Sequence, residues 1–349
     1  MTSDAGFGIV QTDSRPPVRM AVLGVGRIGR LHAQLLHREV PGATVTAVAD
    51  MSPEAAEGVA ADLGVPALAI DELLTLDTVD AVAICTSTPT HVDLIVRAAR
   101  AGKAILCEKP VSLDLGEVDR AIAALEAAGV PFMVGFNRRF DPGHASVREA
   151  VGAGAIGDLH TLRITSRDPA PPPPEYVAES GGIFLDMTIH DFDMARFIVG
   201  SEVVEVYARG AVRIDPRIGQ AGDVDTAVTL LTHENGTITS IENSRQAVYG
   251  FDQRIEAFGS GGVAVSDNPS RHSGWRMTSD GRAGEPLPWF FLDRYLPSYR
   301  HEWAAFVDLV RDGGPSPVGA LDGRAPVAIA LAATRSLREG RPVAMSEMG

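Results

Sequence analysis

The sequence contains little cysteine and no long apolar segment. Cys85 and Cys107, the two cysteines among 349 residues, each end a short apolar run, so we expect small buried side chains in a reducing compartment and no disulfide framework. No apolar run approaches the roughly 20 residues that a membrane span needs. Residues 1–16 lack the basic start and apolar core of a secretory signal, and we expect a loose tail. These absences predict a cytoplasmic protein.

Positive charge is also in short supply. Lys and Arg number 31 against 45 Asp and Glu, a formal net charge of −14, which argues against nucleic acid or an anionic membrane as partner. No cluster of Cys and His has the spacing of metal ligands, so no metal is predicted. The 45% hydrophobic and 22% charged content is that of a globular protein, and 349 residues exceed one ordinary core, so we expect two domains.

A glycine-rich turn follows the first apolar run. Residues 18–25, VRMAVLGV, have the composition of a strand and lead through GVGRIG into the helical pattern RLHAQLLHREV. Strand, G-x-G-x-x-G and helix in this order are typical of dinucleotide binding, because the glycines permit close backbone approach and the helix N-terminus receives the pyrophosphate. The predicted cofactor contacts in this turn are Gly24, Gly26, Arg27, Ile28 and Gly29.

Asp50 ends a second predicted strand, ATVTAVA at 43–49. It lies about 20 residues beyond the glycine motif, where an acid binds the ribose hydroxyls. The same charge repels a 2′-phosphate, so we expect NAD in preference to NADP. The alternative is an ordinary turn residue at the start of the next helix.

Strands and helices continue to alternate up to residue 137. Further apolar strands are DAVAIC, AILC and PFMVGF, with helical patterns between them. This alternation predicts an α/β, Rossmann dinucleotide-binding domain at 17–137, whose parallel sheet binds ligands at the carboxyl ends of its strands. The loops TSTPTH, EKP and NRRF fall at those ends. The predicted cofactor contacts in the first two loops are Thr86, Ser87, Thr88, His91 and Glu108. Glu108 has an alternative role as the partner of a basic neighbour.

Lys109 follows a buried strand and precedes a proline. A lysine held at the mouth of a nucleotide cleft polarises a substrate oxygen and stabilises a developing alkoxide. The alternative is a solvated surface lysine, which is the commoner place for this residue type.

The segment 181–197, GGIFLDMTIHDFDMARF, combines an apolar helical face with acids and an imidazole. Asp186 and His190 are four residues apart, so on a helix they lie on one face, one turn apart. A carboxylate in that place holds the tautomer of the imidazole and stabilises its protonated form, as a general base needs. The alternative is a capping Asp186 and a histidine satisfied in the core.

Several segments together resemble the glucose-fructose oxidoreductase/inositol dehydrogenase/rhizopine-catabolism (Gfo/Idh/MocA) family. They are VLGVGRIGRLHA, Asp50, TSTPTHVDL, CEKPVS and the GG-xxx-D-xxx-H-D stretch. The resemblance covers the chain beyond the tail and implies that Lys109, Asp186 and His190 form the catalytic group. Within the family, ITSRDPAPPPPEYV, ENSRQAVYGFDQRIEAFGS and FFLDRYLPSYRHEWAAFVDLV are similar to segments of inositol 2-dehydrogenases. The resemblance also implies a homotetramer, with the last helix, at about 324–338, packed on the first domain.

Residues 138–349 are predicted to form a second, α+β domain for substrate binding and oligomerisation, with a large, mostly antiparallel open sheet. Runs of alternating polarity lie at 159–166, 203–212, 227–232, 237–243, 253–259 and 262–266, and helical patterns lie at 299–311 and 324–337. One face of the sheet should carry the helix at 181–197. The other face must be covered too, because a long exposed sheet is a liability, and this predicts a homo-oligomer.

Polar residues mark the predicted substrate positions. They are Lys109, Asn137, Arg139, Asp168, Asp193 and Tyr249. Structural alternatives remain, with Arg139 as the partner of an acid and Asp168 as a cap of the proline loop. Asp191 is interpreted as structural. Inositol 2-dehydrogenases are expected to carry aromatic-Gly-Tyr where this chain ends the motif in Phe251, so the loss of a hydroxyl leaves the polyol open.

These observations and the resemblance predict an NAD-dependent dehydrogenase of a cyclic polyol, with myo-inositol converted to 2-keto-myo-inositol (scyllo-inosose) as the first choice. His190 is the predicted base, Lys109 polarises the hydroxyl, and Asp186 orients His190. Two alternatives stay open. The substrate is another inositol isomer, an aldose or an anhydrosugar, or the chain is a non-catalytic NAD-binding sensor.

Overall fold

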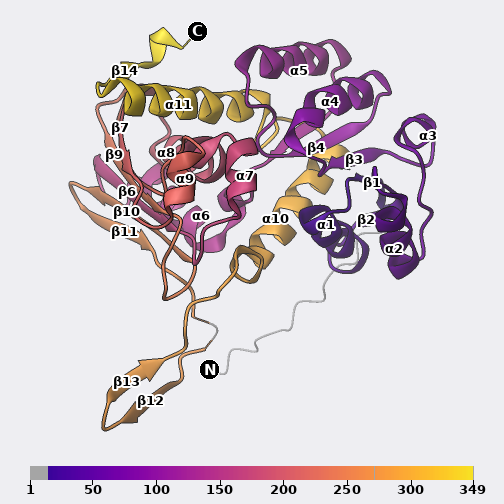
Figure 1. Cartoon of the computed structure of the whole chain (residues 1–349). Helices are drawn as coiled ribbons and strands as arrows, with labels where there is room; N and C mark the ends of the chain where they lie inside the picture. Colours follow the sequence, from indigo (N-terminus) through magenta and orange to yellow (C-terminus); the bar gives the residue numbers. More distant parts are fainter. Residues whose placement is uncertain (1–14, 271, 349) are drawn as a thin grey trace, which may run out of the picture.

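The computed structural model describes residues 15–270 and 272–348, so most of the predicted tail lies outside the described residues. The N-terminal sheet (Figure 1, right) has five parallel strands in the order β2-β1-β3-β4-β5. They are β1 (Val18–Leu23), β2 (Ala43–Ala49), β3 (Ala81–Ile84), β4 (Ala104–Glu108) and β5 (Phe132–Gly135). The three central strands are almost wholly buried and apolar, as strands covered on both faces must be.

Five helices connect these strands. They are α1 (Arg27–Arg38), α2 (Pro53–Leu63), α3 (Ile70–Thr75), α4 (His91–Arg100) and α5 (Leu115–Ala128). The side chains of Ser52 and Asp114 cap α2 and α5 by accepting hydrogen bonds from amides of the first turn. Because β1 lies between β2 and β3, the strand order reverses there, and such sheets bind ligands at the carboxyl edge beside the reversal. The predicted Rossmann-type domain is confirmed.

The C-terminal sheet has seven strands in the order β11-β10-β6-β9-β8-β7-β14. They are β6 (Leu159–Arg167), β7 (Val203–Ala211), β8 (Thr226–His233), β9 (Ile238–Ser244), β10 (Asp252–Gly259), β11 (Gly262–Ser266) and β14 (Val343–Ala344). All neighbours are antiparallel except β6 and β9, because the chain passes through helices and two further strands before β9 returns beside β6. The predicted, mostly antiparallel open sheet is confirmed, with this parallel pair as the exception.

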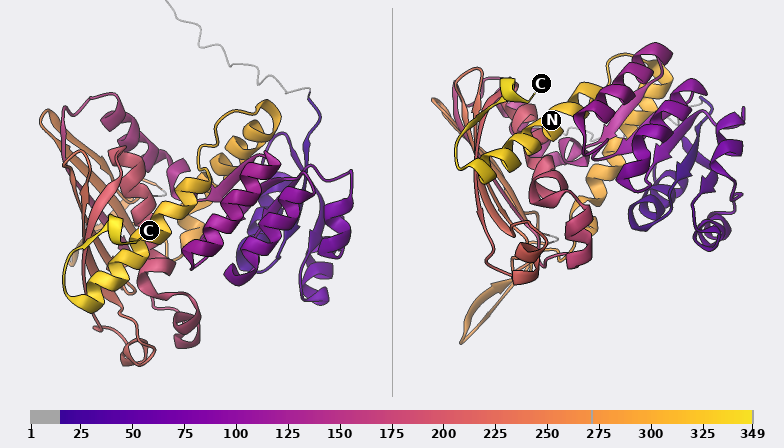
Figure 2. Two further views of the ribbon diagram at one scale, coloured as in Figure 1. Left: turned by 90° about the horizontal axis from the view of Figure 1, so that it is seen from above. Right: turned by 45° about the horizontal axis from the view of Figure 1, so that its top comes forward.

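Helices cover one face of the C-terminal sheet, on the side toward the N-terminal domain (Figure 2). They include α6 (Pro142–Gly152), α8 (Ile189–Val199) and α11 (Ala320–Glu339). The helix predicted at 181–197 is found as a π turn, η3 (Phe184–Thr188), that continues into α8. Large apolar side chains on the opposite face are exposed. They are Val204, Val228, Leu230, Ile238, Phe258, Val263 and Val265.

Two long helices near the C-terminus join the two sheets (Figure 1). The first, α10 (Phe291–Asp312), packs against α1 and β1. It begins earlier than predicted because Pro297, a residue that usually marks a helix limit, lies inside it. The second, α11, contacts α5, where Arg324 and Asp119 form an ion pair of 2.6 Å.

The remaining elements are short. They are η1 (Thr88–Thr90), η2 (Asn137–Phe140), α7 (Pro174–Glu179), α9 (Pro216–Gln220), η4 (Met345–Glu347) and a ribbon of β12 (Trp275–Thr278) and β13 (Gly281–Gly284) that projects from the body in Figure 1. Cys85 and Cys107 are buried and unpaired. Over residues 15–270 and 272–348, no helix has both the length and the apolar character to cross a membrane.

Candidate active site

The turn between β1 and α1 passes close over the end of β3. Gly24 has φ +86, and a Cβ added to it would lie 2.7 Å from the amide nitrogen of Thr86. A Cβ on Gly29 would lie 1.8 Å from the carbonyl oxygen of Gly24, so both positions require glycine. Space around Gly26 is open to 4 Å, and α1 has no side-chain cap and no acid in its first turn. This turn fits a dinucleotide pyrophosphate.

Asp50 binds the same turn through its carboxylate. Its Oδ2 accepts a hydrogen bond of 2.7 Å from the amide of Val25, and its Oδ1 accepts one of 2.9 Å from the amide of Ser52. The side chain therefore holds the turn in shape. Its contact with Ser52 agrees with the alternative role of Asp50 as a turn residue at the start of the next helix. It also stands at the carboxyl end of β2 beside the glycine motif, where ribose recognition takes place in this fold.

The loop after β3 departs from the prediction at His91. This side chain is buried, with Nδ1 2.8 Å from the carbonyl oxygen of Pro110 and Nε2 3.0 Å from that of Thr86. It therefore joins two loops from within and has no open side for a cofactor, which corrects the predicted contact. Burial lowers the pKa of His91. Ser87 is exposed and Thr88 half-buried, so both remain accessible.

Glu108 also faces inward. Its Oε1 lies 2.7 Å from Nε2 of His32, a residue of α1, and its Oε2 accepts a hydrogen bond of 3.2 Å from the amide of Lys109. The predicted contact with the cofactor is therefore replaced by the alternative, a pairing with a basic neighbour. The reason is that a buried carboxylate needs donors on every side, and α1 supplies one.

Lys109 reaches from the N-terminal domain to the C-terminal one. It is half-buried, and its Nζ donates a hydrogen bond of 3.0 Å to the backbone carbonyl of Asp186 in η3. The chain has one further lysine, Lys103, whose buried Nζ binds the carbonyls of Leu76 and Val79. Lys109 is thus the lysine that links the two domains, and the surface alternative does not apply to it.

The carboxylate of Asp186 is held by two side chains that the sequence did not indicate. Its Oδ1 accepts a hydrogen bond of 2.9 Å from the hydroxyl of Tyr176, and its Oδ2 accepts one of 3.0 Å from Arg245. The predicted hydrogen bond to His190 is not formed. Arg245 is almost fully buried and is a full cation, so it draws the carboxylate more strongly than a neutral imidazole does. The wider π turn also changes the spacing expected of an α-helix.

His190 is half-buried in the first turn of α8. Its Nδ1 is enclosed and has no hydrogen-bond partner among the described residues, and its ring meets Phe136 edge-on at 6.0 Å between centroids. Burial, followed by the charges of Lys109 and Arg138, lowers the pKa of His190 well below its usual value. The imidazole is therefore neutral at pH 7, which is the state a general base needs.

Asp168 and Asn137, two of the predicted substrate residues, have different surroundings. Burial, with the charge of Asp186 next, raises the pKa of Asp168 to about 6. Asp168 therefore lies close enough to Asp186 for the negative charge of Asp186 to raise its pKa. Asn137 is buried and donates to the hydroxyl of Ser298 at 3.1 Å, so its amide helps to fix η2 against α10.

Arg139 and Asp193 bind each other, which corrects their predicted contact with substrate. The guanidinium of Arg139 makes a forked contact with the Asp193 carboxylate, at 2.9 and 2.6 Å, and reaches Asp322 of α11 at 2.9 Å. Both partners are buried. This is the alternative of an Arg139 paired with an acid, and it follows because a buried charge requires an opposite one.

Tyr249 is about half exposed and binds two charged side chains. Its hydroxyl accepts from Arg167 at 2.7 Å and donates to Asp252 at 2.8 Å, at the end of β6 and β10, and its predicted contact with substrate stays a prediction. Phe251 is buried, and its ring meets Tyr295 edge-on at 5.9 Å. Residue 251 therefore stands at a packed position, and the hydroxyl of a tyrosine there would lie within that packing.

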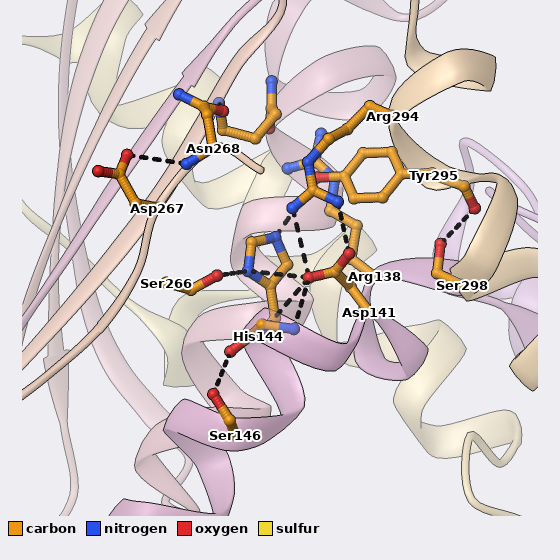
Figure 3. Close-up of polar contacts among 12 residues, drawn as sticks. Arg138, Asp141, His144, Ser146, Ser266, Asp267, Asn268, Arg294, Tyr295 and Ser298 are labelled. Carbon is orange, nitrogen blue, oxygen red and sulfur yellow. Dashed lines mark hydrogen bonds and ion pairs between the residues drawn. The ribbon is translucent and has the colours of Figure 1, made fainter. Parts of the chain in front are cut away.

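A buried polar layer that the sequence did not indicate includes Arg138, whose charge acts on His190. Arg138 binds Asp191 at 2.6 Å, which agrees with the structural interpretation of that acid. Figure 3 shows His144 enclosed beside Asp141 and Arg294, with its Nδ1 2.9 Å from the hydroxyl of Ser266. Burial lowers the pKa of His144 to about 3, although the Asp141 charge opposes this. The available signal for such residues was a charged side chain within an otherwise apolar pattern, which is rare unless paired.

Comparison with known proteins agrees with this geometry. Residues 18–136 match the model of an oxidoreductase family with an NAD-binding Rossmann fold, and residues 144–265 match the GFO/IDH/MocA C-terminal domain. The chain is 46% identical over 333 residues to a myo-inositol 2-dehydrogenase of Thermotoga maritima, covering 95% of this chain and 99% of that one.

Solved structures show the same fold. A probable dehydrogenase from Thermotoga maritima matches with a TM-score of 0.93 and 46% identity, over 95% of this chain and 100% of that one. A scyllo-inositol dehydrogenase from Lactobacillus casei, solved with bound NAD(H) and scyllo-inositol, matches with a TM-score of 0.87 and 27% identity, over 95% of this chain and 99% of that one.

The two family models together span most of the chain, so the resemblance stated from its motifs is confirmed. The glycine turn that fits a pyrophosphate agrees with the same assignment. The oxidoreductase family model and the relatives named as dehydrogenases set the sensor alternative aside. The chain belongs to the Gfo/Idh/MocA oxidoreductase family and is an NAD-dependent dehydrogenase.

Proposed function

We propose that this dehydrogenase oxidises myo-inositol at C2 to 2-keto-myo-inositol. The observation that carries the proposal is the contact of Lys109 with the backbone of Asp186, which links the carboxyl edge of the nucleotide-binding sheet to the π turn that leads into α8 and His190. The high identity over nearly the full length to a relative named myo-inositol 2-dehydrogenase supports the substrate class. A small neutral polyol needs no basic patch on the protein, so it also suits a chain with a net charge of −14.

The glycine turn fits the cofactor. The residues proposed to hold it are Gly24, Gly26, Arg27, Ile28, Gly29, Asp50, Thr86, Ser87 and Thr88. NAD bound there supplies the acceptor for the hydride. Asp50 disfavours a 2′-phosphate, so we propose NAD in preference to NADP.

Three side chains act on the substrate in this proposal. His190, neutral at pH 7, takes the proton of the hydroxyl through its Nε2. Lys109 donates a hydrogen bond to the same oxygen and stabilises the charge that develops on it. Asp186 orients His190 in the reacting complex. Its carboxylate gives up the hydrogen bond from Tyr176 and accepts one from the buried, unpartnered Nδ1 of His190 instead.

The test is the initial rate of NADH formation with NAD⁺ and with NADP⁺ across a panel of myo-, scyllo- and D-chiro-inositol, glucose, xylose and levoglucosan. Turnover highest with myo-inositol and NAD⁺ is the expected result. The second candidate is oxidation of scyllo-inositol, which the solved relative with bound scyllo-inositol supports. Turnover highest with scyllo-inositol would favour this candidate. No turnover with any inositol would overturn the proposed substrate class.

We also propose that the chain is a cytoplasmic homotetramer whose domains divide at residues 137 and 138. The seven exposed apolar side chains on the outer face of the C-terminal sheet support a second copy as their cover. Light scattering measures the mass directly. A polar substitution at the centre of that face, Leu230→Glu, is expected to reduce the assembly, and an unchanged mass would contradict this interface.

A further inference from the structure

His32 is a buried histidine that the proposed chemistry does not use. It lies in α1, with its side chain fully enclosed, and both ring nitrogens have partners. The indole Nε1 of Trp303 donates a hydrogen bond of 2.8 Å to Nδ1 of His32. An indole nitrogen can only donate, so Nδ1 carries no proton and the proton of the neutral ring is on Nε2. Trp303 therefore fixes the tautomer of His32.

The proton on Nε2 points at the residue before Lys109. Nε2 of His32 lies 2.7 Å from Oε1 of Glu108, so it donates to that carboxylate. The other oxygen of Glu108 accepts from the amide of Lys109 at 3.2 Å. A Cβ added to Gly135 of β5 would lie 3.2 Å from the same carboxylate, so the carboxylate packs against a position of β5 that carries no side chain. His32 is the one side chain that the described contacts give as a donor to Glu108.

Two further residues of α10, the helix that carries Trp303, lie near His32 and Glu108. The ring of Tyr299 meets His32 edge-on at 5.3 Å. Glu302 is fully buried, and neither of its carboxyl oxygens has a hydrogen-bond partner within the described chain. Burial, followed by the charge of Glu108, raises the pKa of Glu302 well above its usual value, so Glu302 is a neutral acid. Glu302 therefore offers no charge that competes with Glu108 for the donor on His32.

We propose that His32 is a positioning residue for the reaction: held in one tautomer by Trp303, it fixes the Glu108 carboxylate, and Glu108 fixes the backbone from which Lys109 reaches toward Asp186. The inference rests on the proposed function in that Lys109 acts on the substrate oxygen. A buried carboxylate that loses a donor must rotate or take up a proton. Either change moves the backbone of Lys109, and a displacement near ~1 Å at a reacting group costs about 10²-fold in rate.

The test compares His32→Leu with His32→Gln. Glutamine supplies one acceptor for Trp303 and one donor for Glu108, whereas leucine has neither. We expect kcat per folded protein to fall by about 10²-fold in His32→Leu and to be largely restored in His32→Gln, with the dissociation constant for NADH little changed in both. Trp303→Phe removes the indole donor alone and should lower kcat less, in the same direction.

A buried histidine outside this group provides the matched control. His233 also has partners on both ring nitrogens, Ser201 and Thr239, and lies in β8. His233→Leu is expected to lower the melting temperature without lowering kcat per folded protein. A purely structural role for His32 predicts the same pattern for His32→Leu, and that result would overturn the proposal.

A readout that needs no substrate separates this inference from the proposed function. Lys103 and Lys109 are the two lysines of the chain, so acylation of Lys109 can be followed by peptide mass spectrometry. The acylation rate of Lys109 should rise several-fold in His32→Leu and return toward wild type in His32→Gln. Equal rates in all three proteins would refute the positioning role even if myo-inositol is the substrate. A shifted rate in a protein that oxidises no inositol would instead refute the substrate alone.

Discussion

The ammonium of Lys109 lies 3.0 Å from the backbone carbonyl of Asp186, so a residue that directly follows a parallel strand touches one in a π turn 77 residues later. This contact links the N-terminal sheet to the π turn that precedes α8. It places the lysine charge beside His190, whose pKa it helps to lower. The arrangement sets a positive charge beside an unprotonated imidazole, which suits the proposed removal of a hydroxyl proton.

Replacing Lys109 by methionine should lower kcat with myo-inositol by about 10² to 10⁴, the scale of a group that stabilises charge in the transition state. The same loss is expected for His190→Ala. Steady-state kinetics on the folded fraction measure both. Lys103→Met is the control, because Lys103 binds two backbone carbonyls and should affect the melting temperature instead. Near-wild-type turnover in either site variant would refute its catalytic role.

Asp168 should control how substrate binding depends on pH. Its pKa is raised to about 6, so the carboxyl group is protonated below that pH and ionised above it. An ionised carboxylate accepts hydrogen bonds from hydroxyls of a polyol, so KM should rise as pH falls through about 6. In Asp168→Asn this inflection should disappear. If the variant keeps the same inflection in KM, another group is responsible.

Asp50 should set the choice between NAD and NADP. Asp50→Ser removes the charge that disfavours the 2′-phosphate while keeping a small polar side chain. The ratio of kcat/KM for the two cofactors should shift toward NADP. Because Asp50 also accepts from the amides of Val25 and Ser52, some loss of activity with NAD is expected as well. An unchanged ratio would show that Asp50 only shapes the turn.

His144 should make the protein less stable in mild acid. Its folded pKa of about 3 lies below the usual value near 6.5, so the unfolded chain binds a proton first as pH falls. The stability it contributes is present above about pH 6.5 and is lost progressively toward pH 3, by up to about 5 kcal/mol in the free energy of unfolding.

Urea unfolding at several pH values tests this, with His144→Gln as the comparison. The variant should be less stable near neutral pH and should show a smaller decline between pH 6.5 and 4. His160→Gln is the control, because His160 meets Phe258 on the exposed side of the sheet. Parallel pH curves for wild type and His144→Gln would contradict the assignment.

Arg139 should be structural. Arg139→Met leaves Asp193 buried without its cation, and breaking a buried pair in this way costs about 3–5 kcal/mol in the free energy of unfolding. Substrate KM should not change in the folded fraction, because the pair lies against Asp322 of α11. A large rise in KM with unchanged stability would restore the predicted substrate contact.

Local patterns determined much of this protein. The alternation of buried strands and helices predicted the parallel sheet, the glycine spacing predicted the turn that only glycine permits at Gly24 and Gly29, and period-two runs predicted all six long strands of the second sheet. These features follow from interactions within a few residues, or from the periodicity of a face that must be buried, and both are written directly in the sequence.

Only the tertiary structure decided which partner each buried charge has. Asp186 binds Arg245 and Tyr176 instead of His190, Arg139 binds Asp193, and Glu108 binds His32. Most of these partners are 54 to 76 residues apart. The free energy of burying a charge depends on which opposite charge the folded chain brings within hydrogen-bond distance, and spacing along the sequence does not contain that information.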